Sequence, residues 1–303
     1  MPAHRSLSFH TCDVFTDRRF GGNPLAVVLD AAGLDDARMQ RIAREFNLAE
    51  TVFVREPRNP INTASLRIFT PGRELPFAGH PTIGAAVLLA HTREPDLLKR
   101  EDLRIVLEEE VGEVVCVARH RKGQAMAAYF TLPRLPARQG KPPSLKALAE
   151  GLGLKNADIG FDDHRPTAYS AGAPFVFVPL RNLDAMTRAK PMLKLWGKQG
   201  GPAVFLYTRE VAHQGSSFHA RMFASGWGIV EDPATGSAAA AFAGVIMRFE
   251  PPEDGDSMFV IEQGLEMGRP SFISLGLSID KRALVSATIG GAAVMISQGT
   301  IDL

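Results

Sequence analysis

The sequence predicts an α+β protein of two similar lobes, each built around a central buried helix. Two segments support this, because each carries a proline, a glycine three residues later and then a run of small apolar residues. They are Phe77–Leu89 (FAGHPTIGAAVLL) and Val230–Phe242 (VEDPATGSAAAAF). A helix that is apolar on every side is buried on every side. The length of 303 residues also suits two domains better than one.

The first lobe is predicted from hydrophobic periodicity. Residues 35–46 have the spacing of an amphipathic helix, with Met39, Ile42, Ala43 and Phe46 on one face. Strands are expected at residues 7–15, 25–29, 51–54 and 64–69, followed by a hairpin of residues 103–107 and 111–118 and a strand near 125–132.

A proline-rich stretch separates the two halves and indicates a linker. Its prolines are Pro133, Pro136, Pro142 and Pro143. Beyond it we expect a helix near 145–151, strands near 173–179 and 203–208, and an apolar helix after Asp232. Residues 282–296 again resemble a strand and are expected to return to the first lobe. The predicted lobes are therefore 1–132 plus 283–303, and 133–282.

Composition and charge describe a globular protein without a strong field. Hydrophobic residues make up 45% and charged residues 22%, and 34 basic against 33 acidic residues leave a net charge of +1. We therefore expect no nucleic-acid partner. The charged runs Lys99–Asp102 and Glu108–Glu110 are interpreted as solvated faces.

Targeting signals and cysteine usage favour a cytoplasmic protein. The N-terminus lacks the apolar core of a signal peptide, and no run of about 18 apolar residues predicts a membrane span. Cys12 and Cys116 lie in strand-like stretches and form no C-x-x-C pair, so we expect buried, reduced thiols.

The two apolar helices are expected to begin in the same way. Their prolines suit the first helical position, and the preceding His80 and Asp232 would be N-caps. Gly84 and Gly236 would lie inside the helices, where glycine costs about 1 kcal/mol against alanine, which suggests close approach by a strand or a ligand. The N-termini could bind a carboxylate or stabilise an enolate-like intermediate. Well-capped core helices are the alternative, and the repetition makes the two interpretations about equally good.

Glu50 stands at a predicted helix-to-strand junction between apolar neighbours. Such a residue is either exposed at a bend or partly buried, and partial burial would suit a general acid/base. Spacing and composition alone favour a surface glutamate.

Six strings, in order along the chain, resemble the PhzF family. They are Asp13–Thr16 (DVFT), Gly21–Val28 (GGNPLAVV), Asn47–Val54 (NLAETVFV), Pro76–Thr82 (PFAGHPT), Glu231–Ala238 (EDPATGSA) and Glu262–Ser271 (EQGLEMGRPS). The resemblance implies the diaminopimelate-epimerase-like fold, with two β-barrel-like lobes that each enclose a helix. It also implies an active site between the lobes and a homodimer.

The resemblance also implies an isomerase that shifts a proton on a small carboxylate-bearing substrate without a cofactor. Glu50 would be the acid/base, with His80 and Asp232 as the other catalytic residues. The substrate would be held by Gly79, Gly236 and Ser237. In this hypothesis Glu50 removes a C–H proton and returns it to another carbon of the same conjugated system.

Other chemistries fit the sequence less well. The histidines have no metal-binding spacing, and the glycines form neither a phosphate loop nor a dinucleotide fingerprint. Diaminopimelate epimerases and proline racemases use paired cysteines where this chain has Gly79 and Asp232, so two-thiol racemisation is excluded. Ala49 replaces a serine that is frequent in PhzF proteins, which removes one hydroxyl donor.

Two alternative functions remain open. One is a lyase (dehydratase) that uses the same Glu50, and the other is a non-catalytic protein that binds a small acid. Phe175 and Trp227 are candidates for tuning substrate choice, with core packing as the alternative for each.

Overall fold

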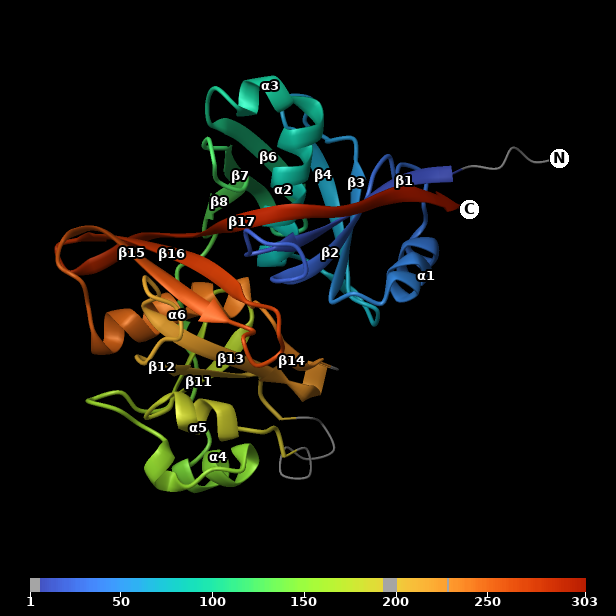
Figure 1. Cartoon of the computed structure of the whole chain (residues 1–303). Helices are drawn as coiled ribbons and strands as arrows, with labels where there is room; N and C mark the ends of the chain where they lie inside the picture. Colours follow the sequence, from blue (N-terminus) through green and yellow to red (C-terminus); the bar gives the residue numbers. More distant parts are fainter. Residues whose placement is uncertain (1–5, 193–200, 228) are drawn as a thin grey trace. The chain divides into compact units, whose positions relative to one another are not determined.

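The computed structural model describes residues 6–192, 201–227 and 229–303, except for the side chain of Trp227 (Figure 1). The chain divides into two compact units. Unit 1 comprises Met1–Thr131 and Gly290–Leu303, and unit 2 comprises Leu132–Ile289. The predicted α+β fold is confirmed, because each unit is a curved sheet with one central helix.

Unit 1 is a closed barrel of eight strands. Its strands are β1 (Ser6–Val14), β2 (Asn23–Val28), β3 (Glu50–Arg55), β4 (Ala64–Phe69), β6 (Leu103–Glu109), β7 (Gly112–Arg119), β8 (Ala127–Thr131) and the second part of β17 (Ala283–Asp302), beside the short β5 (Glu74–Leu75). The ring runs β1–β2–β3–β4–β6–β7–β8–β17 and closes where β17 pairs with β1. The helices are α1 (Asp36–Phe46), α2 (Gly79–Arg93) and α3 (Pro95–Leu98).

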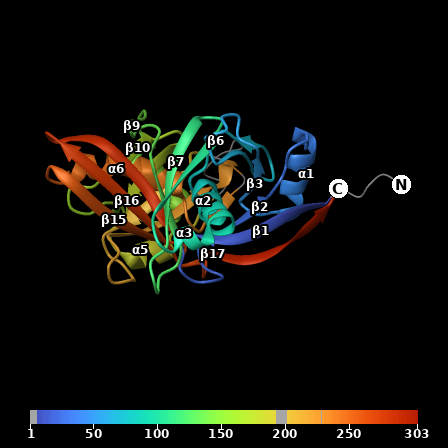
Figure 2. The ribbon, with the colours of Figure 1, turned by 90° about the horizontal axis from the view of Figure 1, so that it is seen from above.

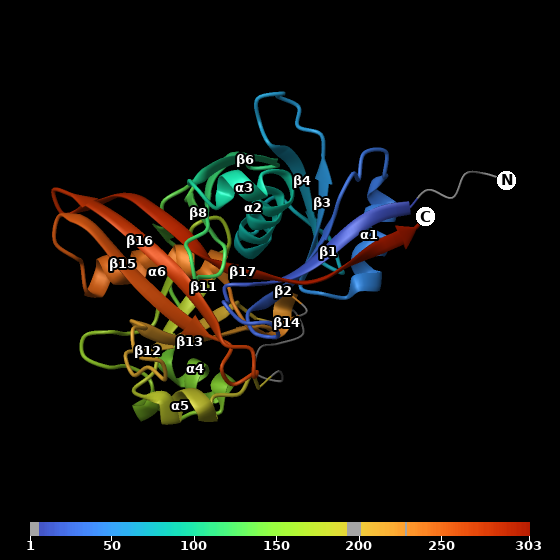
Figure 3. The ribbon, with the colours of Figure 1, turned by 45° about the horizontal axis from the view of Figure 1, so that its top comes forward.

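Helix α2 fills the barrel of unit 1, as Figures 2 and 3 show. All its residues from Gly79 to Ala90 are buried, and it packs against β1, β2, β3, β6, β7 and β8. At Gly84 an added Cβ would lie 2.5 Å from Leu25 Cδ2 and 2.9 Å from Val14 Cγ2. The close approach predicted at this glycine is therefore made by strands β1 and β2.

Unit 2 repeats the order of unit 1. Its strands are β9 (Ala137–Arg138), β10 (Thr167–Ser170), β11 (Pro174–Pro179), β12 (Val204–Thr208), β13 (Phe218–Ala224), β14 (Ile229–Asp232), β15 (Gly255–Gln263), β16 (Ser271–Asp280) and the first part of β17. The helices are α4 (Leu145–Leu152), α5 (Leu183–Arg188) and α6 (Gly236–Phe249), with 3₁₀ turns at Asn156–Asp158 and Ser225–Trp227.

The repeat is visible in the strand pairing. In unit 1 the parallel pair β2–β3 is connected through α1, and in unit 2 the parallel pair β11–β12 is connected through α5. The central helices occupy equivalent crossovers, since α2 lies between the parallel strands β4 and β6 and α6 between β13 and β15.

Helix α6 is the buried helix of unit 2, as the sequence predicts. Its Phe242 is fully buried among four aromatic rings of the sheet, with ring centroids 4.8–5.8 Å away. Gly236, however, is the first residue of the helix and not an interior one. The close approach occurs instead at Gly244, where an added Cβ would lie 2.5 Å from the ring of Tyr169.

Most predicted elements of unit 1 are confirmed, and so is the amphipathic face of α1. Met39 and Ala43 are buried, and Ile42 and Phe46 pack against the same cluster. Strands β10, β13, β14, β15 and β16 are additions that the sequence analysis did not predict. No helix among the described residues is long and apolar enough to cross a membrane.

Two side-chain predictions are settled by burial. Glu108 and Glu109 are buried, so the interpretation of Glu108–Glu110 as a solvated face is wrong for two of its three residues. The two side chains point to opposite faces of β6, and each is covered: Glu108 accepts backbone N–H groups of Arg58 and Asn59, and Glu109 contacts the hydroxyl of Thr82 in α2. Phe175 is buried in the core, whereas the side chain of Trp227 lies outside the described residues.

Candidate active site

Glu50 is the first residue of β3, four residues after the end of α1. Asn47 ends α1 in the left-handed conformation and turns the chain directly into the strand, which pairs Glu50 with Leu25 of β2. The Glu50 side chain is only 12% exposed, and its Oε2 lies 3.3 Å from His80 Nε2. The preference for a surface glutamate is therefore wrong, because β3 carries this side chain to the start of α2.

His80 lies in the first turn of α2, where it contacts Glu50. The N-cap of α2 is Ala78, so His80 is the second helical residue and Pro81 the third. The predictions of a His80 cap and of proline at the first position are thus wrong. Pro81 is accommodated because the first i→i−4 hydrogen bond of α2 runs from Thr82 N to Ala78 O. Residues before Thr82 have no intrahelical acceptor for an N–H group, so the missing N–H of Pro81 costs no hydrogen bond.

Burial determines the charge of the imidazole. It lowers the pKa of His80 to about 3, so the ring is neutral near pH 7. The contact with Glu50 then joins a neutral ring to a carboxyl group. Ala78 provides no side-chain cap, so the first N–H groups of α2 keep their capacity to bind an anion.

Asp232 ends strand β14 of unit 2, just before α6. Thr235, not Asp232, is the N-cap of α6, and Pro233 precedes the helix instead of opening it. Asp232 is nevertheless held by the helix start, because Thr235 Oγ1 donates to its Oδ2 at 2.6 Å. Its backbone oxygen accepts from Gln263 Nε2 at 2.7 Å.

The predicted site residues gather at the starts of the two central helices. Glu50, Gly79 and His80 meet at α2 in unit 1, while Asp232 lies just before Gly236 and the half-buried Ser237 in unit 2. The expectation that both groups face one cleft stays a prediction.

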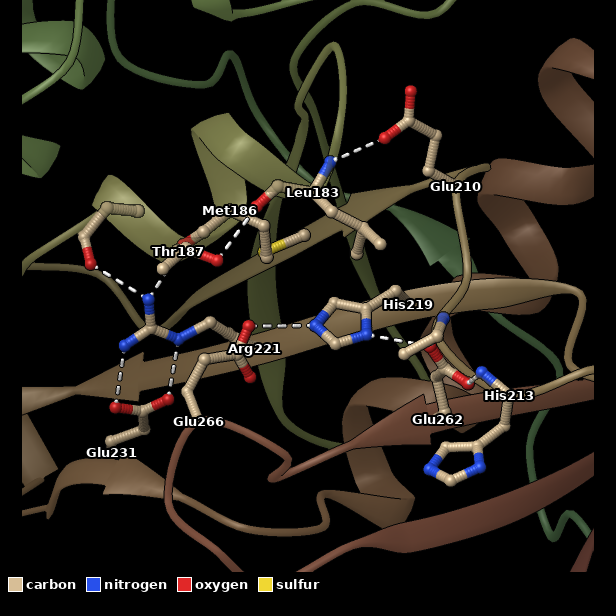
Figure 4. A network of polar contacts seen from close by, with 12 residues as sticks. Leu183, Met186, Thr187, Glu210, His213, His219, Arg221, Glu231, Glu262 and Glu266 are labelled. Carbon is tan, nitrogen blue, oxygen red and sulfur yellow. Dashed lines mark hydrogen bonds and ion pairs between the residues drawn. The ribbon is translucent and has the colours of Figure 1, made fainter.

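A charged network links β13 to β14 and β15 of unit 2 (Figure 4). His219 of β13 donates to Glu262 Oε1 at 2.8 Å and to Glu266 Oε1 at 2.9 Å. Burial opposes a charge on this ring, but the two carboxylates outweigh it and raise the pKa of His219 to about 9. The imidazolium therefore binds β15 and the loop that follows it to β13.

The cysteines are unsuited to proton transfer. Cys12 and Cys116 are both buried free thiols, as predicted. Burial raises the pKa of Cys12 to about 12 and raises that of Cys116 as well. Neither thiol supplies a thiolate near neutral pH, because only the deprotonated form is a reactive base or nucleophile.

Sequence analysis missed three polar residues that hold the helix starts. They are Thr82 and Glu109 in unit 1 and Gln263 in unit 2. The internal repeat was the signal that could have found them, because Glu109 and Gln263 each follow a carboxylate at the end of an equivalent strand.

Comparison with known proteins identifies relatives over nearly the whole chain. The signature of the phenazine biosynthesis-like proteins (PhzC-PhzF) matches residues 12–299. The chain is 47% identical to an uncharacterized isomerase of Mesorhizobium japonicum, over 95% of this chain and 96% of that protein. It is 35% identical to the trans-2,3-dihydro-3-hydroxyanthranilate isomerase of Pseudomonas fluorescens, over 96% of this chain and 98% of that one. A crystal structure of a Bacillus anthracis phenazine biosynthesis protein of the PhzF family matches with a TM-score of 0.87 and 26% identity, covering 98% and 99% of the two chains.

Proposed function

The chain belongs to the phenazine biosynthesis-like (PhzC-PhzF) family, and we propose that it is an isomerase in which Glu50 moves a proton on a small carboxylate-bearing substrate. Relatives with an assigned reaction include the trans-2,3-dihydro-3-hydroxyanthranilate isomerases of two Pseudomonas species, which confirms the expected enzyme class. The role of Glu50 and the substrate class are inferences from the family resemblance and from the contacts of Glu50 at the start of α2.

The contact between Glu50 and His80 is the observation that carries the proposal. A carboxyl group with 12% exposure is shielded from water but reachable, as a general acid/base must be. Because His80 is neutral, it does not neutralise the Glu50 carboxylate with a full positive charge. Glu50 can therefore accept a C–H proton, carry it, and release it to another carbon of the substrate.

The helix starts supply the proposed binding groups. The N–H groups around Gly79 carry the partial positive charge of a helix N-terminus, which suits a substrate carboxylate. Asp232, Gly236 and Ser237 are proposed to bind polar substituents of the substrate from unit 2. A cyclic, unsaturated amino or hydroxy acid fits this set, and the substrate named for the Pseudomonas fluorescens relative is of that class.

The test is hydrogen exchange in D₂O with trans-2,3-dihydro-3-hydroxyanthranilate as the probe. The parent protein should incorporate deuterium, because the proton held on Glu50 exchanges with the solvent before it is returned. Apart from that deuterium, the product should have the mass of the substrate. Glu50→Gln should slow incorporation by about 10²–10⁴-fold, because positioned acid/base catalysis is worth that much. Glu45→Gln, an exposed position on α1, is the matched control.

Each other outcome has a definite meaning. Equal incorporation by the parent and Glu50→Gln would disprove the role of Glu50. Loss of water from the product would identify a dehydratase. Tight binding of the probe without exchange would indicate a binding protein for this ligand.

A further inference from the structure

Glu109, the last residue of β6, is a buried carboxyl group beside the first turn of α2. Its residue exposure is 2%, and its Oε1 lies 2.7 Å from Thr82 Oγ1. The same hydroxyl lies 2.8 Å from Ala78 O, the carbonyl oxygen of the α2 N-cap. Glu109 thus reaches, through Thr82, the helical turn that carries His80.

Counting protons assigns the charge state of this group. A carbonyl oxygen only accepts, so the single Thr82 hydroxyl proton is donated to Ala78 O. The second contact of that hydroxyl then needs a proton from the Glu109 carboxyl group. Glu109 Oε2 has no hydrogen-bond partner among the described residues, and leaving it as a neutral carbonyl costs far less than burying it as an unpaired charge.

Burial, and not a neighbouring charge, favours the same state. The titratable and charged groups near Glu109 are Cys116 on β7, Glu108 and Glu110 beside it, and Arg55, Glu56, Arg58, Arg67 and Glu74, which line the same groove of about 400 Å³. Arg58 binds Glu108, and Arg67 binds Glu74 and Asp36. Burial raises the pKa of Glu109 to about 8.

In unit 2 a side chain at the end of the equivalent strand also contacts a threonine hydroxyl at the start of the central helix, but the residue is glutamine. Glu108 and Glu262 are equivalent, because each accepts backbone N–H groups from residues 50 and 49 positions earlier. The next residues are Glu109 and Gln263. Gln263 Nε2 donates to Thr235 Oγ1 at 3.0 Å, and that hydroxyl donates onward to Asp232. An amide donates at any pH, whereas a carboxyl group donates only while it is protonated.

We propose that Glu109 is a positioning residue that, as a neutral acid, donates to Thr82 and holds the first turn of α2 with His80 against Glu50. The effect on turnover depends on the proposed function. The protonation of Glu109 does not, so the two can be tested apart.

The first experiment measures thermal unfolding against pH for the parent and Glu109→Gln. The folded state holds a proton on Glu109 up to about pH 8, whereas an ordinary glutamate releases it near 4.5. Between these values the folded state binds more protons, so its stability falls as pH rises, by about tenfold in the unfolding constant per pH unit. The stability of Glu109→Gln should lack this dependence on pH. The Tm of the variant, relative to the Tm of the parent, should therefore rise from pH 5 to pH 8.

The control for this experiment is Glu110→Gln, an exposed change in the same run. Its Tm curve should parallel that of the parent. If the curve of Glu109→Gln also parallels the parent at every pH, Glu109 is ionised in the folded protein and the proposal is wrong.

The second experiment follows kcat in the D₂O assay across the same pH range and above it. The parent should lose kcat above about pH 8, while Glu109→Gln should keep the alkaline limb because its amide still donates. Glu109→Ala removes the donor and should lower kcat at every pH. If Glu109→Gln is as inactive as Glu109→Ala although both unfold cooperatively, donation to Thr82 is not what Glu109 provides. Absence of any exchange by the parent would count against the proposed function, and the Tm series would still decide the state of Glu109.

Discussion

Unit 1 and unit 2 place an arginine at the same point of one framework, but they bury it to different depths. Arg67 of β4 and Arg221 of β13 each bind a glutamate and lie over a phenylalanine two residues further along, at 5.3 and 4.8 Å. The Arg67 side chain is 22% exposed and also binds the exposed Asp36. The Arg221 side chain is 8% exposed and also donates to the backbone oxygens of Met186 and Ala189.

This difference shows that the repeated backbone fixes where a charged group lies but not what it contributes. Water can replace the partners of Arg67, because they stand at the surface. The partners of Arg221 include two carbonyl oxygens near the end of α5 that no water reaches easily. The equivalent residues should therefore differ in energy although they agree in geometry.

The largest expected effect is at this pair. Arg221→Met should lower the free energy of unfolding by about 3–5 kcal/mol, because it leaves the partly buried Glu231 carboxylate without its counterion and removes the donors to the carbonyl oxygens of Met186 and Ala189. Arg67→Met should cost about 1 kcal/mol or less, as expected for a partly exposed ion pair. Urea unfolding of both variants measures the difference. Equal losses would show that the depth of burial does not separate the two units.

A second contrast concerns His219 and its equivalent Ser65, which pair with Glu262 and Glu108. The folded pKa of His219 is raised from 6.5 to about 9, so its stabilisation is complete below pH 6.5 and is lost as pH rises through 9. His219→Gln should destabilise by on the order of 3 kcal/mol at pH 6 and by much less at pH 9.5. Ser65→Ala should show a difference from the parent that does not change with pH.

The smallest expected effect is at the equivalent caps of α1 and α5. Asp35 accepts from Arg38 N at 2.7 Å, and Asn182 accepts from Ala185 N at 2.9 Å. Asp35→Asn should lower the free energy of unfolding by about 0.3–1 kcal/mol, and Asn182→Asp should raise it by about the same amount. The reason is that the negative charge of a carboxylate interacts favourably with the helix dipole. Urea unfolding at low and high salt tests this, since both changes should shrink in high salt. Shifts of the same sign would contradict the equivalence.

Hydrophobic pattern was sufficient to predict the central helices and most strands of unit 1. Strand β13 was missed because its sequence, FHARMFA, places His219 and Arg221 at positions where a buried strand is expected to be apolar. Their burial depends on Glu262, Glu266 and Glu231, which come from other strands and a loop. Local sequence does not contain that information.

The same limit explains the error at Glu108 and Glu109. Three consecutive glutamates are usually solvated, and nothing in the run itself indicates the N–H groups of Arg58 and Asn59. Family resemblance, by contrast, indicated Glu50 and His80, which spacing alone had left as a surface glutamate and a cap. Their contact arises because β3 and α2 belong to one barrel.

Strand β17 determines the order in which the two units can complete their folding. Residue 302 pairs with residue 6, so the barrel that contains β1 cannot close until β17 has left the ribosome. Until then β1 and β8 present open edges, which are sites where unfinished chains aggregate. Translation usually lets the earlier part of a chain fold first, but here unit 1 is completed only by a strand that follows unit 2 in the sequence.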